Sequence, residues 1–365
     1  MKNTFGSSVA VTLFGESHGE YIGAVIDGIC PGIEIDYALV DFQLSRRRPQ
    51  LACDTKRREK DNYKIISGVF NGKTTGTPLT VIIPNEDTKS GDYQKISPRP
   101  SHADYTASEK YHGFEDYRGG GHFSGRITAA LVVVGAILTS ALNKLGIKIG
   151  THVLKCGEAE DKLFDFDPSA EIDVVIKKAF PTILEETENK ILSEIEKARL
   201  DADSIGGILE SAIVGMPVGV GEPWFDTVEG VISHALFSLG GVKGVSFGGG
   251  FDLSNMRGSE ANDPFEIKDG KVVTTKNNSG GINGGITNGM PITIKTAVKP
   301  TPSIGKAQNS VDLEKMESTS LEIKGRHDPA IVRRVAVVVD SVLAICMADM
   351  LSQRYGTDVF LNGIK

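Results

Sequence analysis

The sequence predicts an α+β fold in which antiparallel β-sheets enclose long buried helices. Residues 126–145 and 330–354 are apolar on most faces, as expected of helices that are buried all round. Strand-like segments outnumber helices and are joined by short turns, which favours antiparallel pairing. No Pro/Ser-rich linker and no change of composition interrupts the 365 residues, so we expect one domain over 1–365.

The predicted strands are short runs of apolar and β-branched residues bounded by glycines or polar turns. They cover residues 8–14, 22–29, 147–154, 242–252 and 292–298, and a further strand begins at 206. Residues 65–83 predict a hairpin with Asn71-Gly72 as its turn. Residues 183–200 carry apolar residues at helical spacing and predict an amphipathic surface helix.

A Gly-Arg pair stands just before each long apolar helix, as Gly125-Arg126 and Gly325-Arg326. Two buried helices that each begin beside a cation suggest two pseudo-repeated halves around a helical layer.

The composition argues against several classes of protein. With 47 acidic and 40 basic residues the net charge is -7, which disfavours general nucleic-acid binding and requires any anion site to be built locally. No apolar run reaches the roughly 18 residues of a membrane span. The scattered cysteines and the lack of a signal-peptide pattern favour a reduced, cytoplasmic protein. No spacing of His, Cys and Asp indicates a metal site.

Residues 114–128 are the strongest local signal. Three glycines follow Arg118, and then His122, Phe123, Ser124 and Arg126 precede an apolar helix. Glycines allow tight turns and close approach of the backbone to a ligand, and donors and cations at a helix start suit an anion. Taken alone, this stretch is equally well interpreted as a loop with a basic rim.

Charged and titratable residues in other constrained loops favour a site. Arginines in loops or at helix starts bind phosphate and carboxylate bidentately, although each could be solvated surface charge. The candidates are Arg47, Arg99, Arg126 and Arg326. Together they predict a small, multiply anionic ligand.

Two histidines lie in Gly- or Pro-constrained loops and are candidate proton donors, namely His18 and His102. Asp328, at the start of the second apolar helix, is either a site residue or a helix cap. The remaining isolated histidines, His112, His152 and His234, are interpreted as structural.

The segment GESHG around Ser17 matches the G-x-S-x-G motif of serine hydrolases. That motif requires a helix after the serine, whereas a strand-like segment follows here. A histidine adjacent in sequence is also badly placed to act as the base. We therefore disfavour a serine hydrolase.

An ordered set of motifs identifies a family resemblance over nearly the whole chain. GESHG, RRRP, RPSHADYT, YRGGG, NNSGGINGGITNG, KPTPS and GRHDP occur in this order. The chain in this respect closely resembles chorismate synthases. The resemblance implies a β-α-β sandwich that assembles as a homotetramer. It also implies a 1,4-anti elimination of phosphate from 5-enolpyruvylshikimate 3-phosphate, giving chorismate, with reduced FMN and without net redox. NADPH is the implied reductant in bifunctional members.

The same resemblance implies roles for individual residues. His18 would protonate the reduced flavin, His102 the leaving phosphate, and Asp328 would act with the flavin N5. The implied clamps for phosphate and carboxylates are Arg47, Arg99, Arg126 and Arg326. The implied flavin contacts are His122, Phe123, Ser124, Gly240, Gly241, Gly284, Lys299, Pro300, Thr301, Pro302, Ser303 and Arg326.

The chain departs from the family pattern at a few positions. His122 stands where an arginine is usual, Phe123 where a serine is usual, Ile127 replaces a glutamate and Cys53 an arginine. Loss of a permanent charge at 122 could make flavin affinity lower or pH-dependent. Two hypotheses therefore stand: an active chorismate synthase, or a catalytically impaired homologue that binds FMN or a phosphometabolite.

Overall fold

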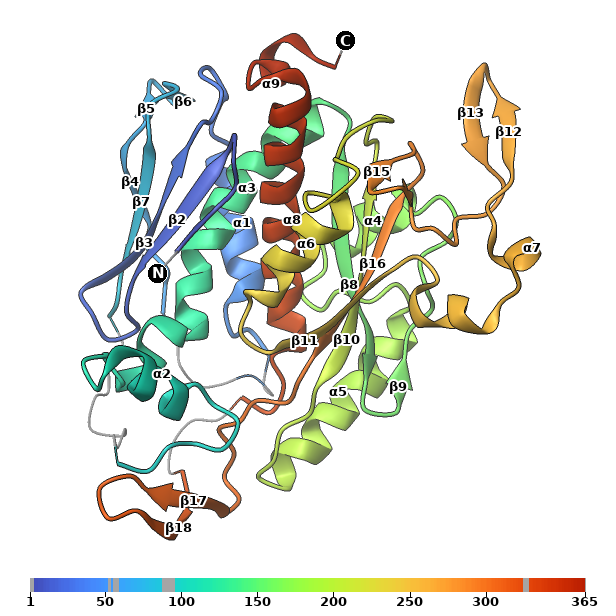
Figure 1. Ribbon diagram of the computed structural model, residues 1–365. Helices are drawn as coiled ribbons and strands as arrows, with labels where there is room; N and C mark the ends of the chain where they lie inside the picture. The colour runs from blue at the N-terminus through green and yellow to red at the C-terminus, as the bar shows by residue number, and fades with distance from the viewer. Residues whose placement is uncertain (1–2, 52–53, 55–58, 87–95, 324–327, 365) are drawn as a thin grey trace.

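A layer of three helices lies between two five-stranded sheets in the computed structural model (Figure 1). The structure describes residues 3–51, 54, 59–86, 96–323 and 328–364. The central helices are α1 (Tyr37–Arg47), α3 (Thr128–Lys144) and α8 (Val332–Tyr355), and they pack against one another. The prediction of antiparallel sheets enclosing buried helices is confirmed.

The first sheet has the order β1-β2-β3-β7-β4, and all its pairs are antiparallel. Its strands are β1 (Thr4–Phe5), β2 (Ala10–Gly15), β3 (Tyr21–Asp27), β7 (Leu79–Pro84) and β4 (Lys64–Ser67). Alternate residues of β7 are buried against the helix layer, as the two-residue period of a strand requires. The small hairpin of β5 (Val69–Phe70) and β6 (Lys73–Thr74) turns at Asn71-Gly72 with φ of 48° and 75°, as predicted.

The second sheet has the order β11-β16-β10-β8-β9 and is also antiparallel. Its strands are β11 (Val242–Phe247), β16 (Ile292–Val298), β10 (Gly207–Val214), β8 (Lys148–Cys156) and β9 (Ala159–Glu160). Helices α4 (Ser169–Val175) and α5 (Glu185–Leu200) cover its outer face, and α8 covers the inner face. Strand β8 is buried along almost its whole length because both faces are covered.

The two long central helices divide their contacts between the sheets. Helix α3 packs on β3 and β7 of the first sheet, and α8 packs on β8 and β10 of the second. The helices touch each other where a Cβ at Gly135 would lie 2.3 Å from the Cβ of Ser341, so only glycine fits there. Both helices are long and apolar enough to span a membrane, yet 78% and 94% of their most apolar windows are buried inside the protein. They are core helices, and each packs mainly against one of the two sheets.

Several elements differ from the sequence-based expectation. The strand predicted over 242–252 ends at Phe247, and a 3₁₀ turn η4 (Gly250–Asn255) follows because Gly248 and Gly250 both have φ of 54°. Elements that were not predicted are β1, β9, α1, α2 (Asp104–Tyr111), α4, α6 (Val228–Phe237), α7 (Gly258–Ala261), α9 (Val359–Asn362), the β12–β13 hairpin (Phe265–Lys268, Lys271–Thr274), the β14–β15 hairpin (Ile282–Asn283, Ile286–Thr287) and the β17–β18 hairpin (Gln308–Asp312, Glu317–Leu321).

One continuous apolar cluster joins the two sheets through the helix layer. It includes Ile22 of β3, Ile137 of α3, Leu343 of α8 and Leu209 of β10, all 0–1% exposed. Because no boundary divides this cluster among the described residues, we propose that the chain forms a single domain.

Candidate active site

The three glycines form a tight turn that lies between the two candidate histidines. They have φ of 62°, 83° and 52° within η2 (Arg118–Phe123), a backbone region that favours glycine. A Cβ at Gly119 would lie 2.6 Å from Nε2 of His18, and one at Gly120 would lie 3.4 Å from Cε1 of His102. The turn therefore brings bare backbone against two imidazoles that are 84 residues apart in sequence.

His18 lies in the turn between β2 and β3, as predicted, and is half-buried. The turn is held by Asn85, whose Nδ2 donates to the carbonyls of Glu16 at 2.9 Å and Gly19 at 2.8 Å. The Oδ1 of Asn85 accepts from Nε of Arg126 at 2.9 Å. Asn85 was not a predicted site residue, and its polar loop gave no local signal for this role.

His102 sits in a network of charged hydrogen bonds. Its Nδ1 lies 2.6 Å from Oδ1 of Asp104, and Arg99 donates through Nε and Nη2 to both oxygens of the same carboxylate at 2.7 and 2.8 Å. Burial alone would raise the pKa of Asp104, but the hydrogen bonds from Arg99 and His102 hold it well below its usual range. Arg99 also donates to Oγ of Ser303 at 3.1 Å, and Lys299 donates to the carbonyl of Ser101 at 2.6 Å. The loop of His102 is thus tied to residues 299–303.

Three arginines meet at one end of the helix layer, where α1 ends and α3 and α8 begin. They are Arg47 in the last turn of α1, Arg126 in η3 (Gly125–Ile127) and Arg334 in the first turn of α8. The expectation that Arg47 lies in a loop or at a helix start is wrong, because the chain remains helical through it. Burial lowers the pKa of Arg47 to about 10, opposed by Asp61 and supported by the charges of Arg126 and Arg334.

Arg47 is a buried cation without a close partner at its Nε. It is 8% exposed, and its Nη2 lies 3.8 Å from Oδ2 of Asp61, beyond hydrogen-bond distance. Among the residues that the structure describes, its Nε has no hydrogen-bond partner. A buried guanidinium in this state is suited to receive an anionic ligand.

Arg126 has the opposite character, since its guanidinium is already surrounded by acceptors of the chain. It donates to Glu59 at 2.7 Å, to Asp61, to the carbonyl of Pro84 at 2.9 Å and to Asn85. The side chains of Arg126, Glu59 and Asp61 are only 4%, 6% and 2% exposed. Neither acidic residue was predicted, because their pairing with Arg126 joins segments 65 and more residues apart.

Asp328 is not the cap of the second long helix. The N-cap position of α8 is Ile331, and the carboxylate of Asp328 instead accepts from Arg334. Its carbonyl accepts from Oγ1 of Thr301 at 2.7 Å. Asp328 therefore lies beside residues 299–303. Arg326 and Cys53 lie outside the described residues.

Several of the predicted flavin contacts come together, and one does not. The backbone N–H of Lys299 donates to the carbonyl of Gly241 at 2.9 Å, and a Cβ at Gly240 would meet nothing within 4 Å. Pro300 to Ser303 continue from there toward Arg99. Gly284, in the β14–β15 turn, lies toward the other end of β16, where Gly281 approaches the carbonyl of Pro291.

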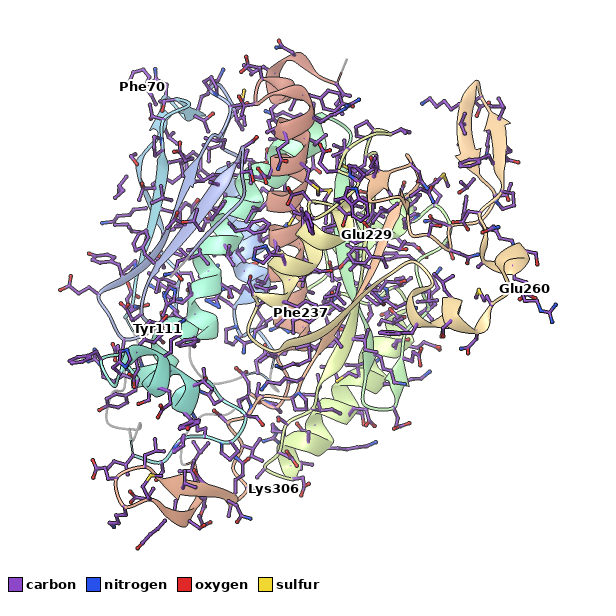
Figure 2. The ribbon with its side chains drawn as sticks, viewed as in Figure 1. Phe70, Tyr111, Glu229, Phe237, Glu260 and Lys306 are labelled. Carbon is purple, nitrogen blue, oxygen red and sulfur yellow. The ribbon has the colours of Figure 1, made fainter. Side chains whose placement is uncertain are left out.

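The residues at 122–124 each contact the chain itself. Nδ1 of His122 lies 2.7 Å from the carbonyl of Gly15, which ties η2 to the end of β2. The ring of Phe123 is 43% exposed and makes an edge contact with Tyr111 at 6.2 Å. Tyr111 is labelled in Figure 2 at the end of α2 and marks this corner of the molecule. Oγ of Ser124 accepts from the backbone of Arg126 at 3.3 Å.

The alternatives raised by the sequence are not favoured by the geometry. Ser17 is followed by strand β3 and its Oγ is fully buried. Within the described part of the chain this Oγ has no hydrogen-bond partner, which argues against a serine-hydrolase dyad. His152 is buried between Asp161 at 3.2 Å and Glu210 at 3.0 Å, which is a structural setting. Among the described residues no group of His, Cys, Asp and Glu is arranged to hold a metal.

Comparisons with known proteins agree with one another. A model of the family described as chorismate synthase matches residues 9–352. The chorismate synthase of Korarchaeum cryptofilum is 45% identical over 348 residues, covering 94% of this chain and 96% of the relative. That of Thermococcus gammatolerans is 44% identical over 352 residues, covering 96% and 97%. A crystal structure of a chorismate synthase matches with a TM-score of 0.76 at 28% identity, over 96% of this chain and 94% of the other.

Proposed function

The chain belongs to the chorismate synthase family, a lyase family of the shikimate pathway, and we propose that the site at the glycine turn carries out its reaction. The proposed substrate is 5-enolpyruvylshikimate 3-phosphate. A 1,4-anti elimination breaks its C3–O bond to phosphate and a C6–H bond, and the products are chorismate, phosphate and a proton. None of the comparisons favours a catalytically impaired homologue.

The observation that carries this proposal is the pairing of two imidazoles with a cluster of buried cations. His18 and His102 approach the same glycine turn from different loops. Arg47, Arg126 and Arg334 stand at the adjoining end of the helix layer. A substrate with one phosphate and two carboxylates needs cations to bind it, and a departing phosphate needs a proton donor.

Each residue has a proposed part in the reaction. Arg47, with its unpartnered Nε, binds an anionic group of the substrate, together with Arg99 and Arg326. Arg126 contributes its charge from within a carboxylate cage. His102 donates a proton to the leaving phosphate oxygen, and His18 and Asp328 handle protons on the flavin side of the substrate.

The family uses reduced flavin, and we propose FMN as the form that this chain binds. The glycine-lined backbone fits such a group, because a Cβ at Gly240 would enter open space and the η2 turn offers bare backbone. The residues that would hold it are His122, Phe123, Ser124, Gly240, Gly241, Lys299 to Ser303 and Arg326. Gly284 could join them only from another copy of the chain or after a rearrangement of its turn. When bound, the reduced ring supplies electron density that assists the loss of phosphate.

We further propose a cytoplasmic homotetramer. The chain also oxidises NADPH if it generates its own reduced flavin. Light scattering on the purified chain measures the assembly. Anaerobic NADPH consumption in the presence of FMN measures the reductase activity, and no consumption above the protein-free rate would refute it.

The proposal is tested by anaerobic turnover of 5-enolpyruvylshikimate 3-phosphate with excess reduced FMN, followed by chorismate absorbance. We expect His102→Ala to lower kcat at least ~100-fold, the usual scale for loss of a general acid. His112→Asn is the matched control, because His112 ends α2 with φ of 57°, a conformation that asparagine tolerates. Near-normal turnover by His102→Ala would refute the acid role.

A further inference from the structure

The proton on the ring of His102 can be located from its neighbours. Nδ1 lies 2.6 Å from Oδ1 of Asp104. The carboxyl of Asp104 is held ionised by Arg99 and His102, so it can only accept. If Nδ1 carried no proton, two lone pairs would face each other at that distance. Nδ1 is therefore the donor, and the hydrogen stands between His102 and Asp104.

Arg99 does not change this assignment. Its Nη2 lies 3.0 Å from Nδ1 of His102 but also donates to Oδ1 of Asp104 at 2.8 Å. A guanidinium has no lone pair to accept a proton, and the in-plane position of Nδ1 is already used by the shorter bond to Asp104. Arg99 instead fixes the carboxylate of Asp104. Its side chain donates to both carboxylate oxygens, and its backbone N–H donates to Oδ2 at 3.0 Å.

The opposite nitrogen of His102 is the one left for chemistry. Nε2 would lie 3.6 Å from a Cβ at Gly120, so it faces the glycine turn. His102 also lines a small hollow with Gly120, Phe123 and Glu115. The imidazole is thus held from one edge and presented to the site from the other.

We propose that Asp104 is a positioning residue for His102: it keeps a proton on Nδ1 and thereby commits Nε2 to the exchange with substrate. This inference rests on the proposed function. In the imidazolium form Nε2–H gives its proton to the phosphate oxygen as the C3–O bond breaks. The neutral ring that remains carries its proton on Nδ1, the tautomer that Asp104 stabilises. Asp104 itself stays ionised and takes no proton.

The tautomer can be measured without turnover. In substrate-free protein labelled with ¹⁵N-histidine, we expect the neutral ring of His102 to show a protonated Nδ1 and a bare Nε2. Its signals are assigned by their loss in His102→Gln. In Asp104→Asn the amide can donate to Nδ1, so the proton should move to Nε2. A wild-type ring already protonated on Nε2, or no change in Asp104→Asn, would overturn the inference.

Turnover tests the functional half. We expect Asp104→Asn to lower kcat by about 10- to 1000-fold, and by no more than removal of the general acid itself does. KM should change by less than about 3-fold. Asp104→Glu should recover part of this loss. If Asp104 acts through His102, then adding Asp104→Asn to His102→Ala costs less than about 2-fold more. If the losses of kcat in the two single variants multiply in the double variant, or if Asp104→Asn mainly raises KM, then Asp104 only supports the loop or binds substrate.

A control and an independent failure mode complete the design. Asp173→Asn removes a carboxylate from a surface pair with Lys148 whose side chains are 45% and 42% exposed, and it should leave kcat unchanged. If His102→Ala retains turnover while the Nδ1 tautomer is found, the proposed function of His102 fails. If His102→Ala is inactive but the proton is on Nε2, only the role of Asp104 fails.

Discussion

Replacement of Arg126 tests whether this arginine is held to bind substrate or stabilises the fold as a buried cation. Its guanidinium is 4% exposed and contacts Glu59, Asp61, Asn85 and the carbonyl of Pro84. Arg126→Ala leaves two nearly buried carboxylates without their cation. Breaking a buried ion pair in this way costs about 3–5 kcal/mol.

That cost converts into a measurable shift in Tm. Unfolding entropy of about 2.1 cal/mol/K per residue gives roughly 0.8 kcal/mol/K for 365 residues. Arg126→Ala should therefore lower Tm by roughly 4–6 °C, measured by differential scanning calorimetry on the ligand-free protein. Arg199→Ala, which removes a surface pair with Glu196 on α5, is the matched control and should shift Tm by less than about 1 °C.

A compensating variant tests the cause of the loss. The double change of Glu59→Gln and Arg126→Met removes one buried carboxylate with the cation and leaves Asp61 beside Arg47, so it should recover much of the lost Tm. A Tm for Arg126→Ala within about 1 °C of wild type, together with a large rise in KM, would refute the structural interpretation. It would show that Arg126 is held for the substrate alone.

Three further predictions concern other charged groups. Arg47→Met should raise KM for the substrate by about 10- to 100-fold. Tm should stay equal or rise, because a buried cation with an unpartnered Nε is costly to the fold. An unchanged KM in steady-state turnover would exclude Arg47 from the site. Burial opposes charge on His152, but hydrogen bonds to Asp161 and Glu210 raise its pKa, so its contribution is full below the unfolded value of about 6.5 and is lost as pH rises through the folded value. The free energy of unfolding in urea should therefore fall more from pH 6 to 9 in wild type than in His152→Asn. Parallel dependence on pH in the two proteins would contradict this. FMN affinity measured by fluorescence at a single pH should be lower in His122→Ala than in wild type, because Nδ1 of His122 holds the η2 turn to the carbonyl of Gly15 at 2.7 Å; equal affinities would exclude this turn from the flavin site.

The layers of the fold were predictable because the two long central helices, α3 and α8, are apolar on most faces. Residues 126–145 and 330–354 cannot be placed at a surface, and antiparallel strands joined by short turns must then cover them. Helix α1 was missed for the converse reason. It buries Gln43, Arg46 and Arg47 alongside Val40 and Leu44, and these polar residues normally indicate a surface. Arg46 is buried because it pairs with Asp340, 294 residues away, and no local pattern contains that information.

The same limit applies to the site. His18, His102 and the arginines could be singled out because each lies in a loop or a segment where such residues are unusual. Asn85, Glu59 and Asp61 act only through side chains brought close by the fold, so their sequence neighbourhoods are uninformative. Asp104 is intermediate, because it stands two residues from His102 and five from Arg99 but binds both only after the loop closes back on itself.

The three glycines can now be given a physical cause. A Cβ at Gly119 would lie 2.6 Å from the ring of His18, and one at Gly121 would lie 1.9 Å from the carbonyl oxygen of Asp116. A Cβ at Gly120 would only contact His102 at 3.4 Å, but its φ of 83° favours glycine. A side chain at Gly119 would therefore move His18 away from the turn, and one at Gly121 would displace the backbone at Asp116. Three glycines cost roughly 1 kcal/mol each in conformational freedom. In return, their backbone lets His18 and His102 approach the same turn closely. It follows that the approach of His18 and His102 to this turn is set by its glycine backbone, whereas His122 holds the turn to the carbonyl of Gly15.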